Sequence, residues 1–203
     1  LVMIDGKKMS RSLGNVLTVE ELESKGYDGR DIRFFLLGAH YRKPLNFSWG
    51  ALETAKNTVR KLNRFIQRLI RFTPGPGVAD TEQWIYDVKH GFAGALDDDL
   101  NISGALAALF DFINRISPSL EKGLFSPTER DRILEVMKGM DSVLGVLHFE
   151  EERIAADVLA LIEKRAALRK EKRWAEADDV RAQLAALGIE VYDTAQGSFW
   201  RQR

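Results

Sequence analysis

Apolar residues recur every three or four positions along most of the chain, which is the spacing of helices that bury one face. The clearest repeat predicts a helix over 49–72, and the Pro and Gly residues of 73–77 end it. Similar repeats predict helices over 80–96, 102–116 and 127–147. Since the links between these helices are short, we expect them to form an antiparallel bundle.

Polar residues at the expected helix starts support these boundaries. Thr18 and Ser126 each precede a Glu by three positions, which is the pattern of a capping box. Asp28 and Ser48 are expected to cap the helices that follow them. The acidic run 97–99 taken alone suggests a divalent-cation site, but we expect it to cap the next helix and to complement its dipole.

After residue 149 the pattern changes. A helix that becomes basic is predicted from Glu150 onward, and another from Trp174 to Gly188. Alternating residues then predict two short strands, 189–192 and 198–201, around a turn. Because an isolated hairpin is marginal in water, we expect it to pack on the preceding helices. The predicted fold class is therefore mainly α, a helical bundle with a small C-terminal α+β hairpin domain. The expected divisions are 1–47, 48–149 and 150–203.

Charge is balanced overall but uneven along the chain. The 203 residues include 30 Lys and Arg and 30 Asp and Glu, so the net charge gives no evidence for a polyanionic partner. The predicted 49–72 helix nevertheless has only Glu53 against six cations: Lys56, Arg60, Lys61, Arg64, Arg68 and Arg71. We interpret these cations either as a contact for a nucleic-acid backbone or as an ordinary solvated face.

Composition also limits the chemistry that these residues can perform. The absence of Cys excludes disulfides, thiol catalysis and Cys-based zinc sites, and the three His residues are far apart, so no metal site is expected. No apolar run reaches the about 18 residues that cross a bilayer, so we expect no membrane contact. The chain opens on Leu1 without a signal-peptide pattern, and we expect a cytoplasmic chain cut from a longer one.

The segment 7–15 concentrates the residues best suited to chemistry. It reads Lys-Lys-Met-Ser-Arg-Ser-Leu-Gly-Asn, with cations, hydroxyls and a Gly in nine positions. Cations and hydroxyls bind phosphate oxygens, and Gly allows close approach of the backbone. Such a loop suits a triphosphate whose leaving group gains charge in the transition state. A solvated basic turn is the alternative interpretation of the same composition.

The stretch Lys8-Met9-Ser10-Arg11-Ser12 resembles the KMSKS signature of the class I aminoacyl-tRNA synthetases. Further stretches, in the same order, resemble the cysteinyl-tRNA synthetases among them. These stretches are 13–15, 31–36, 40–42, 44–48, 95–101, 188–189 and 193–200. The resemblance therefore runs through most of the chain, and it implies a bundle of the DALR type for 48–149.

The resemblance implies that the signature loop binds ATP, accompanied by magnesium, while cysteine is activated. Lys8 and Arg11 would be the catalytic cations, with Ser10 and Ser12 as further ATP contacts. Arg11 stands where the family usually has Lys, which keeps the charge but replaces a compact ammonium by a planar fork. The family's HIGH motif, nucleotide-binding sheet and zinc site lie upstream of this signature, so we expect zinc only there and an inactive chain without that half.

The resemblance also implies recognition of tRNA(Cys). By alignment with the family, Arg169, Trp174, Asp178 and Asp193 fall where these enzymes contact the GCA anticodon. Aromatic and Arg side chains stack on unpaired bases, and carboxylates accept hydrogen bonds from their amino groups. Trp200 is interpreted as a core residue or as a further base contact. The expected partners are tRNA(Cys), ATP, cysteine and the upstream catalytic half.

Two other functions of the chain remain open, besides that of a part of a cysteine–tRNA ligase. One is a ligase of the same superfamily that joins cysteine to an aminosugar; the basic helix, Trp174 and the turn at Asp193 argue against it. The other is a stand-alone tRNA-binding module, which would have no need of the signature loop.

Overall fold

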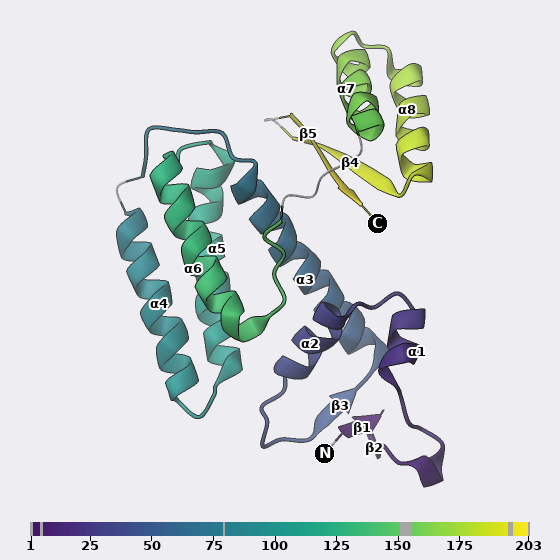
Figure 1. Cartoon of the computed structure of the whole chain (residues 1–203), viewed down its shortest axis with the longest axis vertical. Helices are drawn as coiled ribbons and strands as arrows, with labels where there is room; N and C mark the ends of the chain where they lie inside the picture. The colour runs from purple at the N-terminus through teal and green to yellow at the C-terminus, as the bar shows by residue number, and fades with distance from the viewer. Residues whose placement is uncertain (1, 5, 79, 151–155, 195–196, 203) are drawn as a thin grey trace. The chain divides into compact units, whose positions relative to one another are not determined.

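The computed structural model describes residues 2–4, 6–78, 80–150, 156–194 and 197–202, with the backbone alone for 156, 192–194 and 197–202. The chain divides into two compact units, Leu1–Glu151 and Glu152–Arg203 (Figure 1). The expected division of the first unit near residue 47 stays a prediction. The predicted opening of a helix at Glu150 was wrong, because Glu150 forms a bend, and the predicted continuation through Glu151 and Glu152 lies outside the described residues.

The N-terminal part of the first unit is a small sheet with two short helices. Its strands have the order β2-β1-β3. Met3 of β1 is paired with Lys8 of the antiparallel β2, and Val2 with Leu45 of the parallel β3. A single 3₁₀ turn, Arg11–Leu13, follows the hairpin. The other elements are β1 (Val2–Ile4), β2 (Lys7–Lys8), α1 (Val19–Ser24), α2 (Gly29–Leu37) and β3 (Leu45–Phe47).

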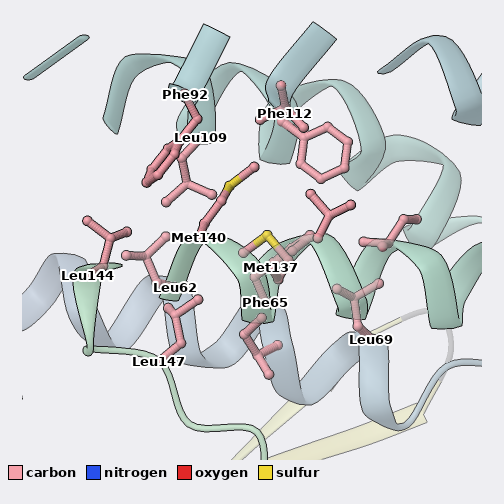
Figure 2. Close-up of a cluster of buried hydrophobic side chains, with 14 of the residues drawn as sticks. Leu62, Phe65, Leu69, Phe92, Leu109, Phe112, Met137, Met140, Leu144 and Leu147 are labelled. Carbon is pink, nitrogen blue, oxygen red and sulfur yellow. The ribbon is translucent and has the colours of Figure 1, made fainter. Parts of the chain in front are cut away.

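Four longer helices form the bundle of the first unit (Figure 1). They are α3 (Trp49–Ile70), α4 (Thr81–Asp97), α5 (Ile102–Glu121) and α6 (Pro127–Leu144). Figure 2 shows their side chains converging on one core, with Leu62, Leu109 and Met137 almost fully buried. The predicted mainly α fold with a helical bundle is confirmed. No helix in the described part of the chain is long and apolar enough to span a bilayer.

The helix starts predicted at Thr18, Asp28, Ser48 and Ser126 are confirmed, whereas two helix ends differ. Thr18, Asp28 and Ser126 all form capping boxes, and the Ser48 hydroxyl accepts a hydrogen bond from the backbone N–H of Ala51. Helix α5 continues past Ile116 to Glu121, because Leu120 is buried in the core on its last turn. Helix α6 ends at Leu144, earlier than predicted, since Gly145 takes a left-handed backbone conformation with φ 64°.

The expected role of the acidic run was wrong. Asp97 is the last residue of α4, and the side chain of Asn101 caps α5 by accepting a hydrogen bond from the backbone N–H of Gly104 at 2.9 Å. Asp99 and Leu100 instead form the tight turn between the helices, with left-handed φ values of 52° and 55°. A cap residue accepts a hydrogen bond from the backbone N–H two or three positions later, in the first turn of its helix. Asn101 stands at that distance from Gly104, whereas the three Asp residues precede the cap position, at the end of α4 and in the turn.

Arg33 connects α2 with the end of α6. Its Nε donates to the carbonyl of Leu144, and its terminal nitrogen donates to the carbonyl of Val143 at 3.0 Å. Carbonyls at a helix C-terminus lack intrahelical donors and carry partial negative charge, so a guanidinium stabilises them. Gly145 leaves room for this contact, because a Cβ there would lie 2.9 Å from Arg33 Nε.

We expect Arg33→Met to lower the free energy of unfolding of the first unit by about 1 kcal/mol, since the carbonyls lose a charged donor. Arg30→Met, on the exposed face of the same helix, is the matched control. Urea unfolding followed by circular dichroism measures both. Equal midpoints for the two variants would show that the contact contributes nothing.

The second unit contains two helices and a hairpin. The elements are α7 (Ala156–Lys170), α8 (Trp174–Ala186), β4 (Ile189–Thr194) and β5 (Gly197–Gln202). The strands are antiparallel, with Val191 paired with Trp200. Ile189 and Val191 share one core with Ile162 and Leu184 of the helices, so the hairpin packs on them as expected. Residues 195–196 of the expected turn lie outside the described residues.

Candidate functional site

The 7–15 segment lies on the surface of the first unit. Gly6, with φ 79°, turns the chain from β1 into β2, and its N–H donates to Asn46 Oδ1 at 2.9 Å. Gly14, with φ 63°, ends the 3₁₀ turn, and its N–H donates to the carbonyl of Arg11 at 3.1 Å. Two left-handed Gly residues therefore bound a short loop that stands away from the core, and we call residues Lys8–Ser12 the signature loop.

The polar side chains of the signature loop are open to solvent. Lys8, Arg11 and Ser12 are exposed, and Ser10 is partly exposed. Within the described residues, neither Lys8 nor Arg11 forms an ion pair. The hydroxyls of Ser10 and Ser12 lie 3.3 Å apart. Two unpaired cations beside two hydroxyls can bind an anion without first breaking internal salt bridges.

Asn15 is a residue to which the sequence assigned no function. Its Oδ1 accepts a hydrogen bond from the N–H of Ser10 at 2.9 Å, and its Nδ2 donates to the carbonyl of Lys8 at 3.1 Å. One side chain thus spans the loop backbone on both sides of Met9. The signal available in the sequence was an amide residue directly after a Gly that closes a turn.

No metal centre is apparent around the signature loop. The described residues contain no group of three His, Asp or Glu side chains placed to hold an ion. With no Cys in the sequence, these residues also cannot supply the Cys ligands of the zinc site that the resemblance implies. The expectation that zinc belongs to residues upstream of this chain stays a prediction.

Some cations of α3 contact other parts of the protein, and others are exposed to solvent. Lys56 Nζ donates to the carbonyl of Gly26 at 2.6 Å, and Arg68 pairs with Glu121 at 3.3 Å. Arg60, Lys61 and Arg64 are exposed and, among the described residues, have no carboxylate within ion-pair distance. We call these last three residues the open basic face.

The second unit brings together three of the four candidate anticodon residues. The guanidinium carbon of Arg169 lies 5.3 Å from the centre of the Trp174 ring, and Trp174 is 54% exposed. Asp178 is exposed one turn after Trp174, on the same side of α8. Asp193 lies in β4 opposite Ser198, but the side chains of Asp193 and Trp200 are outside what the structure describes.

Arg173 orients the start of α8 beside this group. Its guanidinium donates to both carboxylate oxygens of Glu176, at 2.7 and 2.6 Å, and to Glu171 at 3.0 Å. These hydrogen bonds raise the pKa of Arg173 and lower that of Glu176. Lys172, with φ 61°, makes the turn that brings Arg169 and Trp174 close. We call the exposed Trp174 and Asp178, together with the half-buried Arg169, the exposed platform.

A second polar cluster joins the 40–42 loop to the α4–α5 turn of the same unit. Asp99 accepts a hydrogen bond from the Tyr41 hydroxyl at 2.5 Å and pairs with Arg42 at 3.0 Å. The Tyr41 hydrogen bond to Asp99 raises the pKa of Tyr41. His40 stacks on Tyr41 and lies 3.7 Å from Asp99. This cluster fixes the loop between α2 and β3 against the bundle, a role that the sequence pattern did not predict.

Three family models match successive parts of the chain. The model for the class I tRNA synthetase (C) catalytic domain matches residues 1–57, the one for the DALR domain residues 91–148, and the one for the cysteinyl-tRNA ligase anticodon-binding domain residues 151–201. The signature loop and the exposed platform thus fall in the first and the last of these segments, and the core of the bundle falls largely between them.

Curated relatives show the same similarity over nearly the whole chain. The chain is 39% identical to the cysteine–tRNA ligase of Chlamydia felis over 199 residues, which are 97% of this chain and 42% of the relative. The cysteine–tRNA ligases of Protochlamydia amoebophila and Chlamydia caviae are 38% and 37% identical over the same coverage. The chain therefore spans less than half the length of these relatives.

Proposed function

This chain belongs to the cysteine–tRNA ligase family, and on that premise we propose that it is the part of such an enzyme that supplies the signature loop and binds tRNA. The observation that carries the proposal is the order of the three matched segments. The first of them contains two exposed cations, Lys8 and Arg11, that form no ion pair among the described residues. The proposed overall reaction is the ATP-dependent attachment of cysteine to tRNA(Cys).

The signature loop acts on phosphate in this proposal. In the first step, a carboxylate oxygen of cysteine attacks the α-phosphorus of ATP, and the bond to the β-phosphate oxygen breaks to release pyrophosphate. Lys8 and Arg11 stabilise the negative charge that develops on pyrophosphate, while Ser10 and Ser12 donate hydrogen bonds to it. Magnesium would neutralise further phosphate charge, but we assign it no residue in this chain.

The remaining elements bind tRNA in this proposal. The open basic face is suited to sugar-phosphate backbone, because Arg60, Lys61 and Arg64 have no ion pair within the described part of the chain to lose on contact. The exposed platform is suited to unpaired bases, since it offers an aromatic ring, a guanidinium and a carboxylate side by side. Asp193 is proposed as a further anticodon contact on the alignment alone.

Cysteine-dependent ATP–pyrophosphate exchange tests the first step. We expect the isolated chain to give the rate of the blank, and to restore exchange when the upstream part of a related ligase is added. Exchange by the isolated chain, or no exchange by the mixture while both parts are folded, would contradict the proposal. Binding of tRNA without restored exchange would favour a stand-alone tRNA-binding module.

An aminosugar as the acceptor of cysteine is the other alternative. The match of residues 151–201 to an anticodon-binding domain supports tRNA instead, since an aminosugar offers no bases to read. Transfer of cysteine to an aminosugar by the restored mixture, in place of tRNA(Cys), would favour that alternative.

We expect Trp174→Ala to weaken binding of an RNA stem-loop with the GCA anticodon by about 10–100-fold, because stacking of one base on an aromatic ring is lost. Fluorescence anisotropy of the labelled RNA measures the affinity. Tyr86→Ala is the matched control, since Tyr86 of α4 is exposed to 56% and stands outside the platform. Equal affinities of the Trp174 and Tyr86 variants would remove Trp174 from the proposed contact.

A further inference from the structure

We propose that Asn15 is a positioning residue that holds the signature loop in the conformation that binds polyphosphate. The inference rests on the proposed function of the loop. Asn15 lies outside the five signature positions and acts through the loop backbone rather than by touching phosphate.

The Asn15 side-chain amide forms two hydrogen bonds with the backbone of the signature loop. Oδ1 accepts from the N–H of Ser10, and Nδ2 donates to the carbonyl of Lys8. These two backbone groups belong to the residues on either side of Met9, so the amide fixes the peptide planes on both sides of that residue. The Cα positions of Lys8 and Ser10, and hence the directions in which their side chains leave the backbone, are set together.

Few other contacts of the described residues hold this part of the loop. Met9 N–H donates to the carbonyl of Val2 at 3.1 Å, and Leu13 N–H donates to the carbonyl of Ser10 at 3.3 Å. Among the described residues, the hydrogen bond from Met9 to Val2 is the last one between this segment and β1. The Asn15 amide therefore takes the place of a strand partner at the point where the ladder stops.

Preorganisation of the signature loop raises its affinity for polyphosphate. A polyphosphate that binds an ordered loop does not have to supply the free energy of ordering it, so affinity rises without a new contact. The same amide occupies the N–H of Ser10, while the hydroxyls of Ser10 and Ser12 contact each other at 3.3 Å, so a ligand that they both contact replaces this single hydrogen bond. Asn15 is half-buried and is not among the residues of the hydrophobic core, so we assign its side chain to the loop and not to the core.

The test uses the full chain with inorganic tripolyphosphate as the probe, followed through the backbone amide signals of Lys8–Ser12 in NMR spectra. We expect Asn15→Ala to weaken tripolyphosphate binding about tenfold and to remove the hydrogen-exchange protection of the Ser10 amide. The melting temperature should not change, because the side chain does not contribute to the core. Asn57→Ala is the control, as Asn57 is an exposed Asn of α3 whose amide contacts only Glu53 among the described residues.

Three results have different meanings. Equal affinities of Asn15→Ala and Asn57→Ala would overturn the role of Asn15 while leaving the function of the loop intact. A fall in affinity together with a fall in melting temperature would overturn it as well, since the residue would then be structural. No response of the loop amides in the unmodified chain would contradict the proposed phosphate-binding function itself, and the inference with it.

Discussion

Replacing Lys8 by Ala is expected to lower the rate of cysteine-dependent ATP–pyrophosphate exchange by about 10²–10³-fold, in the chain combined with the upstream part of a related ligase. Lys8 is exposed at the end of β2 and, among the described residues, has no ion-pair partner, so its charge is available to the leaving pyrophosphate. A cation whose contact strengthens in the transition state contributes more to the rate constant than to the binding of ATP. The effect should therefore appear chiefly in kcat.

The neighbouring lysine supplies the control for this prediction. Lys7 is equally exposed and lies in the same strand, but successive residues of a strand point to opposite sides. We expect Lys7→Ala to keep the exchange rate within about twofold, because only the general charge of the region changes. Equal losses in the two variants would mean that Lys8 acts through net charge and has no defined position on the phosphates.

The second large effect is expected at Glu129, where the carboxylate ties the start of α6 to the segment before α4. One oxygen accepts from the Val78 N–H and the Thr81 hydroxyl, both at 2.8 Å. The other accepts from the N–H and the hydroxyl of Ser126, at 2.8 and 2.6 Å. Glu129→Gln turns one acceptor into a donor that faces other donors, and we expect a loss of about 2–3 kcal/mol at pH 7.

This loss should depend on pH with a defined sign. Partial burial alone would raise the pKa of Glu129, but the hydrogen bonds from Ser126, Val78 and Thr81 outweigh it and hold the pKa at about 2, below the ordinary 4.5. The charged carboxylate therefore stabilises the fold fully above about pH 4.5, and this contribution disappears as the pH falls toward 2.

Urea unfolding of the parent and the Glu129→Gln variant at several pH values measures the difference. Their free energies of unfolding should converge between about pH 4.5 and 2. Glu135→Gln, an exposed position of the same helix, should stay close to the parent throughout. A Glu129→Gln difference that does not change with pH would show that the carboxylate charge is not what stabilises the contact.

Much of the fold could be predicted because it depends on neighbours in sequence. A cap such as Ser48 acts on a residue three positions away, and the apolar repeat of α3 needs only the helical period. The role of Asp99 depends instead on Tyr41, 58 positions earlier, and a run of three Asp residues before a helix favours the more local interpretation as a cap. Contacts at long sequence separation leave no periodic signal, which is why this prediction was wrong.

In the candidate sites, too, some features could be predicted from the sequence and others could not. The cations and hydroxyls of the signature loop could be chosen from residue type, and the short turn between α7 and α8 places Arg169 over Trp174. The proposed role of Asn15 depends on the direction of its side-chain amide, which residue type alone does not specify. The roles of Lys8, Arg11, Ser10 and Ser12, and of Arg169, Trp174, Asp178 and Asp193, stay proposals.

Charging of tRNA tests the central claim most directly, because it requires the signature loop and the tRNA-binding elements together. The measurement is transfer of radiolabelled cysteine to tRNA(Cys) by this chain mixed with the upstream part of a related ligase, with either part omitted as the blank. We predict charging by the mixture alone, and a large loss when the GCA anticodon is replaced. Folded parts that bind each other but leave tRNA(Cys) uncharged, or that charge tRNA regardless of its anticodon, would contradict the account.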